Sequence, residues 1–304
     1  MTLIETIERQ SARLTQAGVS FGHGTTNAFD EAAWLVLWRL SLPLDELDSV
    51  ADRALTTDEI AAIDTLIERR IATRQPAAYL TREAWLQGVP FYVDERAIVP
   101  RSLIAEAMAD GTLDAWLPEH PRRVLDLCTG NGSLAVLAAM AWPEVSVDAA
   151  DVSADALAVA RINIDTHALA DRIALHQGDG LAAVHGWRYD LILCNPPYVN
   201  AHSMTTLPTE YRKEPSLALA GGADGMDFIR PLLAQAAQYM TDNGVLVLEI
   251  GHERVHFLAA FPTLEFAWLP TNSGSDSVLL IERPALGKAT TANAGLIQDS
   301  KHDC

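Results

Sequence analysis

The stretch Asp190–Tyr198 constrains this chain most, because a short apolar run ends there in two consecutive prolines. The run Leu191–Cys194 has the continuous apolar character of a strand buried on both faces of a parallel sheet. Pro196 and Pro197 must end that strand, since neither donates a ladder hydrogen bond and each fixes its own φ. Ligands of open α/β sheets bind at the carboxyl ends of the strands. We therefore expect Asn195 to lie at the ligand-binding edge of such a sheet.

The side chains of this turn suit a planar nitrogen that carries two hydrogens. The Asn195 carboxamide and the Pro196 carbonyl both accept hydrogen bonds, so together they can hold an –NH2 group. Tyr198 supplies an aromatic face for a planar group. Holding both hydrogens turns the nitrogen lone pair toward an electrophile, which is catalysis by positioning. A proline-terminated strand followed by an ordinary Asn turn explains the same residues equally well.

Strand-like and helix-like segments alternate through the second part of the chain. Such alternation predicts a parallel sheet covered by helices. The expected strands are 123–127, 145–150, 173–176, 191–194 and 245–251, and an antiparallel hairpin is expected to pair 266–270 with 277–282. The expected helices are 133–142, 153–169 and 224–240.

Residues typical of ligand-binding sites directly follow these strands. The loop Cys128–Gly132 follows the first strand, and its glycines let a ligand approach the backbone closely. Asp151 ends the second strand, where a carboxylate can bond ribose hydroxyls, and Asp179 follows the third, where it can bond an adenine amino group. No complete GxGxxG or Walker A sequence is present, which disfavours NAD and ATP. A nucleoside cofactor without phosphates fits better, and S-adenosylmethionine also carries the electrophile that Asn195 needs.

The N-terminal part reads as helical, with hydrophobic spacing over 3–17, 30–40 and 60–71. Thr56 and Glu59 have the spacing of a capping box. A small helical bundle with tryptophans in its core explains this part, and a bundle beside a catalytic domain can also serve as a substrate platform. The segment 84–101 follows as a hairpin that connects two domains.

Composition limits the partners and the compartment. The formal net charge of −18 over 304 residues argues against a general nucleic-acid binder and permits a basic protein partner. Cys128, Cys194 and Cys304 are scattered, which indicates a reducing compartment without a disulfide framework. The N-terminus carries acids where a signal peptide carries bases, and no apolar run approaches membrane-spanning length. We therefore expect a soluble cytoplasmic protein.

The run His252–His256 matches the H-E-x-x-H pattern of zinc proteases. A third ligand such as Glu265 lacks convincing spacing, and a position directly after a buried strand is unusual for that catalytic helix. We expect no metal here and interpret the run as the start of a surface helix.

With these motifs together, the chain resembles the class I S-adenosylmethionine-dependent methyltransferases, and more narrowly the protein-glutamine N(5)-methyltransferases. Several segments are similar to the branch of that family that methylates large-subunit ribosomal protein L-three: Gly22–Asn27, Tyr92–Arg96, Val99–Ser102 and Cys128–Gly130. The branch that methylates peptide-chain release factors has Pro-Arg-Pro-Asp-Thr-Glu and Gly-Thr-Gly at the last two places. The segments 207–215 and 221–225 are similar to the family's loop after the catalytic turn. Asn131 departs from the family, in which a Ser or Thr is usual.

The resemblance implies a Rossmann-like, mostly parallel seven-stranded sheet with an antiparallel C-terminal hairpin, plus a small N-terminal helical domain. It implies direct methyl transfer from S-adenosylmethionine to a glutamine amide nitrogen, without a metal. The implied catalytic residues are Asn195, Pro196 and Tyr198, and the implied substrate contacts are Asn195, Pro196, Pro197 and Tyr198. The implied cofactor-binding residues are Asp126, Cys128, Thr129, Gly130, Asn131, Gly132, Asp151, Asp179, Gly180 and Asn195.

The domain organisation that follows has four parts: a helical substrate-recognition domain (1–83), a hairpin and linker helix (84–118), the methyltransferase domain (119–284) and a disordered polar tail (285–304). Three alternatives remain for the function. The first is the same chemistry on a release factor. The second is an exocyclic-amine DNA adenine methyltransferase, which the acidic charge opposes. The third is a ribosome-assembly factor that only binds S-adenosylmethionine.

Overall fold

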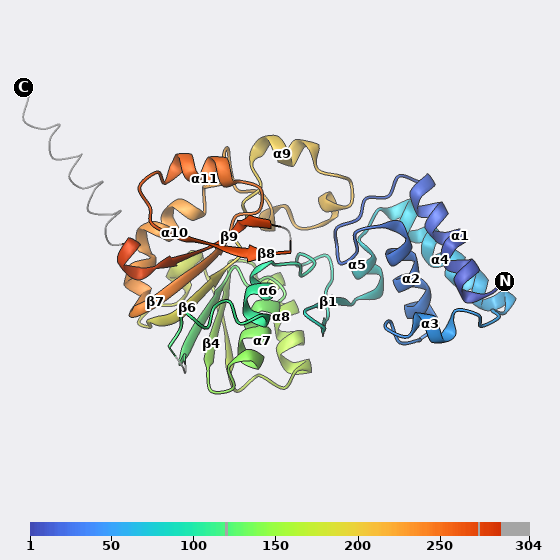
Figure 1. The fold of residues 1–304 in the computed structure, drawn as a ribbon, viewed down its shortest axis with the longest axis horizontal. Coiled ribbons are helices and arrows are strands. Elements are labelled where there is room, and N and C mark those ends of the chain that lie inside the picture. Colours follow the sequence, from blue (N-terminus) through green and yellow to red (C-terminus); the bar gives the residue numbers. More distant parts are fainter. Residues whose placement is uncertain (119–120, 273, 287–304) are drawn as a thin grey trace, which may run out of the picture. The chain divides into compact units, whose positions relative to one another are not determined.

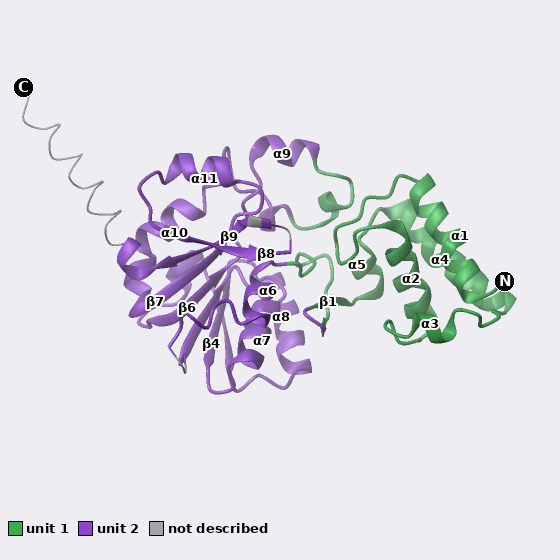
Figure 2. Ribbon diagram, viewed as in Figure 1, with its two compact units in different colours: residues 1–86, 90–101, 207–215 green, residues 87–89, 102–206, 216–304 purple. Residues whose placement is uncertain are grey.

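The computed structural model describes residues 1–118, 121–272 and 274–286. They form two compact units, which Figure 2 colours separately. Unit 1 comprises residues 1–86, 90–101 and 207–215, and unit 2 comprises 87–89, 102–206 and the chain from 216 onward. The expected tail lies outside the described residues from position 287 on, and its first two residues, Ala285 and Leu286, are buried in unit 2. No helix of the described ranges is long and apolar enough to cross a membrane.

Unit 1 is helical, as the hydrophobic spacing predicts. Its helices are α1 (Leu3–Gln16), α2 (Ala28–Arg39), α3 (Leu47–Val50), α4 (Thr57–Thr73) and α5 (Ala77–Thr81). The apolar faces of α1, α2 and α4 pack against one another and form one core (Figure 1). The predicted capping box is confirmed, because the Thr56 hydroxyl accepts from the Glu59 N–H and the Glu59 carboxylate accepts from the Thr56 N–H. The strands β1 (Ala84–Leu86) and β2 (Val89–Phe91) form the expected hairpin.

Buried ion pairs hold the non-helical segments of unit 1 to its helices. Arg70 of α4 is fully buried, and its Nε lies 2.8 Å from Glu31 Oε1 of α2. Glu210, which precedes the short 3-10 helix η2 (Tyr211–Lys213), lies 3.6 Å from Arg70 and 3.1 Å from Arg74. A charge buried with its partner is costly to separate from it, so the Glu31–Arg70 pair holds α2 to α4 and the Glu210 pairs fix where the 207–215 segment lies within unit 1.

Unit 2 is built on a seven-stranded sheet. Its strands are β3 (Arg123–Leu127), β4 (Ser146–Asp151), β5 (Ile173–Gln177), β6 (Tyr189–Cys194), β7 (Met240–Glu249), β8 (Ala267–Thr271) and β9 (Gly274–Glu282). The spatial order is β5-β4-β3-β6-β7-β9-β8. Neighbours from β5 to β7 are parallel, and β9 is antiparallel to both β7 and β8. The predicted mostly parallel sheet with an antiparallel C-terminal hairpin is confirmed.

Helices cover both faces of this sheet (Figure 1). The helices α6 (Ile104–Ala109), α7 (Ser133–Ala141) and α8 (Ala154–Thr166) lie on one face. The other face, which includes Leu125 and Ile192, packs against η1 (Gly180–Ala183), α10 (Ile229–Gln235) and α11 (Arg254–Ala260). The strand order reverses at β3, since β4 lies on one side of it and β6 on the other. Ligands of such sheets bind at this reversal, outside the carboxyl ends of the strands.

One predicted helix is wrong over much of its length. The spacing predicts a helix over 224–240, whereas α10 covers only Ile229–Gln235 and the 3-10 turn η4 covers Ala236–Tyr239. The Asp224 carboxylate accepts from the Met226 N–H (3.1 Å), and Gly225 has a φ of +81°. A side-chain turn and a left-handed residue both interrupt helical backbone, so the helix begins only after them.

We predict that Glu31→Ala lowers the free energy of unfolding of unit 1 by about 3–5 kcal/mol, because it leaves Arg70 buried without its closest carboxylate. Urea unfolding followed by circular dichroism measures the change. Glu8→Ala, which removes an exposed carboxylate from α1, is the control and should cost less than about 0.5 kcal/mol. Equal losses in the two variants would contradict the prediction.

Candidate active site

The predicted catalytic turn directly follows β6, which ends at Cys194. In the sheet register, Cys194 pairs with the last residue of β3 and with the penultimate residue of β7. The residues that follow on these three parallel strands, Asn195, Cys128 and Glu249, therefore lie at the same edge of the sheet. This edge is the carboxyl end of the strands, at the point where the strand order reverses.

The Asn195 carboxamide has no hydrogen-bond partner in the described part of the chain. Neither its oxygen nor its nitrogen forms a hydrogen bond with any residue that the structure describes, and the residue is partly exposed. Pro196 is buried, and Pro197 and Tyr198 are half-buried. A rigid backbone that carries an unengaged amide is suited to bind a substrate –NH2 group.

The glycine loop after β3 is tied to the end of β4. The Thr129 N–H donates to the Ala150 carbonyl (3.0 Å), and the Gly130 N–H donates to the Asp151 carboxylate (2.9 Å). The other Asp151 oxygen accepts from the Ser153 N–H (2.9 Å), and burial raises the pKa of this carboxyl. Each carboxylate oxygen can accept a second hydrogen bond, so Asp151 keeps the capacity to bind two hydroxyls.

The end of β5 joins the same group of loops. The Gly178 N–H donates to the Asp151 carbonyl (3.0 Å), which places the segment 178–180 beside the end of β4. Asp179 is exposed, and Gly180 begins η1 with a φ of +55°. The structure thus gathers the predicted cofactor-binding residues at the carboxyl ends of β3, β4, β5 and β6.

Asn131, where the chain departs from the resembled family, is buried in the loop. Its side-chain oxygen accepts from the Ser133 N–H (3.2 Å), and its carbonyl accepts from the Asn163 amide (2.8 Å). Its Nδ2 is buried and has no hydrogen-bond partner among the described residues. A buried amide donor of this kind is costly unless a ligand or water satisfies it.

Asp126 of β3 holds the loop Cys128–Gly132 and the start of α7 through hydrogen bonds. Its Oδ2 accepts from the Thr129 hydroxyl (2.5 Å) and from the Ala135 N–H of α7 (3.0 Å). Its Oδ1 is buried without a hydrogen-bond partner in the described part of the chain. Burial raises the pKa of this carboxyl to about 7, because the two hydrogen bonds to the ionised form do not offset the loss of water.

Three glycines surround Tyr198 closely. A Cβ added at Gly251, which has a φ of +52°, would lie 2.4 Å from the Tyr198 ring. A Cβ at Gly225 would lie 2.3 Å from the Tyr198 carbonyl oxygen, and one at Gly221 would lie 2.7 Å from its Cα. The ring and the backbone of Tyr198 therefore have little room to move.

Two carboxylates that the motifs do not predict also contact this turn. Glu249 accepts from the Tyr198 hydroxyl (3.2 Å), and Glu253 accepts from the side-chain amide of Asn200 (2.7 Å). The run Glu249–Gly251 directly after a buried apolar strand is the sequence signal for the first, since an acid there must lie at the ligand edge of the sheet.

The zinc-protease pattern does not form its characteristic helix. The helix α11 begins at Arg254, so His252 precedes it and the two histidines do not lie on one helical face. Glu253 bonds Asn200 and His256. No group of three or more His, Cys, Asp and Glu side chains suited to a metal occurs among the residues described.

Unit 1 contains a separate buried cluster of charges. Glu214 lies with its carboxylate 2.7 Å from Arg101 and 3.4 Å from His23 Nε2. Burial opposes the ionisation of Glu214, but the Arg101 guanidinium and the hydrogen bonds hold its pKa at about 2. The Tyr211 ring stacks 4.2 Å from the His23 ring. Glu214 thus engages Arg101 through hydrogen bonds, whereas both ring nitrogens of the buried His23 have no hydrogen-bond partner among the described residues.

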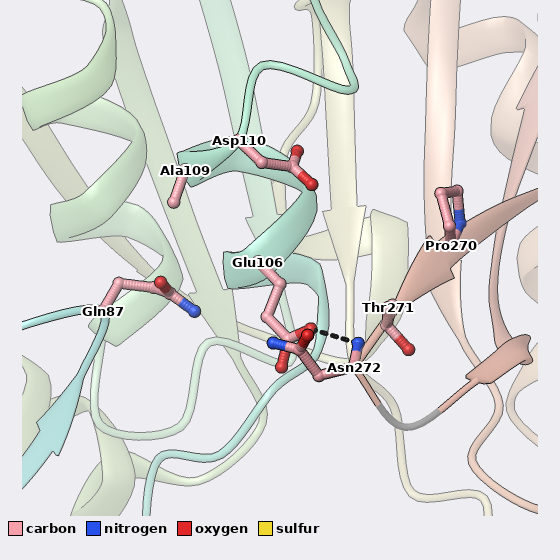
Figure 3. Close-up of a pocket in the computed structure, with 7 residues that line it drawn as sticks. All are labelled: Gln87, Glu106, Ala109, Asp110, Pro270, Thr271 and Asn272. Carbon is pink, nitrogen blue, oxygen red and sulfur yellow. Dashed lines mark hydrogen bonds between the residues drawn. The ribbon is translucent and has the colours of Figure 1, made fainter.

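A polar hollow of about 520 Å³ lies elsewhere in unit 2 (Figure 3). Glu106 and Asp110 of the α6 region line it, together with Asn272, whose N–H donates to Glu106. None of the predicted site residues lines this hollow.

Comparison with known proteins shows the family and the fold of this chain. The family described as "Methyltransferase small domain" matches residues 110–210. The "Ribosomal protein uL3 glutamine methyltransferase" of Burkholderia pseudomallei is 54% identical over 294 residues, covering 94% of this chain and 95% of that protein. The protein of the same name from Bordetella pertussis is 53% identical and covers 94% and 96%. The hMettl16 catalytic domain, solved with an RNA hairpin, has a TM-score of 0.50 at 13% identity over 74% of this chain and 81% of that one, which shows the fold alone.

The sheet, the strand-end loops and the matched domain define a class I methyltransferase. Within that class, the extent and level of identity are decisive: the chain belongs to the family of ribosomal protein uL3 glutamine methyltransferases.

We predict that the contribution of Asp126 to stability falls as the pH rises from about 4 to about 7, by up to about 1.4 kcal/mol per pH unit. In this range the folded protein holds a proton on Asp126 that the unfolded chain has lost, so folding weakens until both forms are ionised above pH 7. Urea unfolding at several pH values should show that this slope decreases in Asp126→Asn. Asp155→Asn, at an exposed carboxylate of the same unit, is the control. An unchanged slope in Asp126→Asn would refute the assignment.

We predict that Gly251→Ala lowers methyl transfer about 100-fold, because the added Cβ meets the Tyr198 ring at 2.4 Å and strains a left-handed residue. Gly88→Ala is the matched control, since Gly88 also has a positive φ but nothing lies within 4 Å of an added Cβ. Initial rates and melting temperatures of both variants separate displacement of the ring from backbone strain. Equal loss of activity in the two variants would mean that strain alone is responsible.

Proposed function

We propose that this protein transfers a methyl group from S-adenosylmethionine to the side-chain amide nitrogen of a glutamine in ribosomal protein uL3. One observation carries the proposal: the Asn195 carboxamide lies at the ligand edge of the sheet without a hydrogen-bond partner among the described residues, in a chain 54% identical to a protein named for this reaction. A glutamine amide nitrogen is a planar –NH2 group, which is the group that this turn suits.

The residues at the strand ends fit the cofactor. Asp151 has acceptor capacity left for ribose hydroxyls, and the buried Asn131 Nδ2 lacks a hydrogen-bond partner among the described residues. The loop Cys128–Gly132 would border the methionine part, and Asp179 with Gly180 would border the adenine. When bound, S-adenosylmethionine supplies the electrophilic methyl group on its sulfonium.

The chain's own residues position the nucleophile. The Asn195 side-chain oxygen and the Pro196 carbonyl would each accept one hydrogen of the glutamine –NH2 group. Pro197 and Tyr198 would wall the pocket and orient the nitrogen lone pair. Transfer would form an N–CH3 bond and break the S–CH3 bond of the sulfonium, which would leave as a neutral thioether, and the nitrogen would lose one proton to solvent. Because amide nitrogens are poor nucleophiles, this orientation accounts for most of the catalysis that the turn can supply.

The two parts of the chain would divide the work. We assign substrate recognition to the N-terminal helical domain (1–83), a connecting role to 84–118 and methyl transfer to 119–284. The net charge of −18 suits a basic ribosomal protein as the partner. A ribosomal substrate is consistent with the expected cytoplasmic location.

The test is methyl transfer from radiolabelled S-adenosylmethionine to purified uL3, to a release factor and to double-stranded DNA. We expect label on uL3 only, and a loss of about 100-fold or more in Asn195→Ala. Asn243→Ala, at an exposed asparagine of β7, is the control and should keep full activity. Label on the release factor or on DNA would overturn the substrate assignment.

The same assay separates catalysis from a binding role. If uL3 is bound but never labelled, the protein acts as an assembly factor and the proposal fails. Raising the salt concentration tests the charge argument, because steering between an acidic enzyme and a basic substrate weakens as ions screen it. A rate that is independent of salt would count against steering.

A further inference from the structure

We propose that Glu249 is a positioning residue of the methyl-transfer site, which acts through the hydroxyl of Tyr198. The proposal rests on the proposed function, because it assigns a role within that reaction. Glu249 is the last residue of β7, only 4% exposed, and adjacent in register to the Asn195 turn. No substrate contact is assigned to it.

The contacts of Glu249 lock it in one orientation. Its Oε2 accepts from the Ser102 hydroxyl (2.6 Å) and from the Leu103 N–H (2.9 Å). Its Oε1 accepts from the Tyr198 hydroxyl (3.2 Å). One buried carboxylate therefore connects the segment before α6, the end of β7 and the catalytic turn. A carboxylate held by neutral donors on both oxygens is a rigid acceptor, because rotation would leave buried donors unpaired.

The Tyr198 ring needs such an acceptor. Gly251 and Gly221 fix the face of the ring and its backbone by close contact, as their missing Cβ atoms show. The contact from Gly251 reaches Cε2 and Cζ of the ring, but it does not fix the hydroxyl. The hydrogen bond to Glu249 does, so the ring that walls the substrate pocket is held at both ends.

A second carboxylate holds the chain just beyond the ring. Glu253 accepts from the backbone N–H (3.3 Å) and the side-chain amide (2.7 Å) of Asn200. Gly225 allows this approach, since a Cβ there would lie 3.0 Å from the Glu253 side chain. Glu249 and Glu253 thus secure the segment 198–200 at its two ends.

The geometry distinguishes positioning from general-base catalysis. Both Glu249 oxygens already accept hydrogen bonds from protein donors, and the residue is buried. A base would act on the reacting nitrogen whether or not Tyr198 has a hydroxyl. A positioning residue acts only through that hydroxyl, so its effect should disappear once the hydroxyl is removed.

A double-mutant cycle tests this distinction. Glu249→Gln and Tyr198→Phe should each lower kcat about 10-fold or more, with the KM for S-adenosylmethionine unchanged. The double variant should be no slower than the slower single variant, because both changes remove the same contact. Glu144→Gln, at an exposed glutamate of the same unit, is the control. If the losses in kcat multiply in the double variant, Glu249 does not act through Tyr198 and the proposal fails.

A spectroscopic measurement keeps this test independent of the substrate. The six tyrosines can be replaced by 3-fluorotyrosine, and the 19F resonance that disappears in Tyr198→Phe is that of Tyr198. We expect this resonance to shift in Glu249→Gln and to stay in place in Glu144→Gln. No shift in Glu249→Gln would overturn the positioning role. If the resonance shifts in Glu249→Gln as expected but the wild-type protein does not label uL3, the proposed function alone is overturned.

Discussion

The ending of parallel strands in register is the constraint on which the rest of unit 2 depends. The prolines after Cys194 stop β6, because they cannot extend the hydrogen-bond ladder. Its neighbours β3 and β7 end at matching positions, so a glycine loop, an amide turn and the carboxylate of Glu249 meet at one edge. The sheet fixes the backbone that carries each of these groups, so the groups lie close together at this edge.

Buried carboxylates secure the segments that the sheet and the helices do not hold. In unit 1, Glu31 and Glu214 pair with arginines, and the positive charge compensates for their lost hydration. In unit 2, Asp126 and Glu249 meet neutral hydroxyl and backbone donors instead. Neutral donors stabilise a buried charge less fully, which is why the pKa of Asp126 rises to about 7. Within unit 2, the hydrogen bonds of Asp126 and Glu249 restrain the glycine loop and the Asn195–Tyr198 turn.

The elements with strong local signals were predictable. Apolar strand runs, the capping box at Thr56 and the C-terminal hairpin depend on a few neighbouring positions, and each is present. The helix expected over 224–240 forms only over Ile229–Gln235, because the Asp224 turn and the left-handed Gly225 prevent it from beginning earlier. The contacts of Glu249 could not be predicted from the sequence either, since Ser102 lies 147 positions away.

The sequence by itself determined the chemistry available at the site. Asn195 after a buried strand, two prolines and acids after successive strands already specify an edge suited to a nucleoside and an –NH2 group. The identity of the family also follows from the sequence alone, through its identity with curated relatives. Only the tertiary structure decided which polar groups are engaged and which are unengaged. The strand order places β7 next to β6, and Glu249 reaches Tyr198 for that reason. Sequence spacing does not contain this information, because long-range pairing depends on how the whole sheet packs.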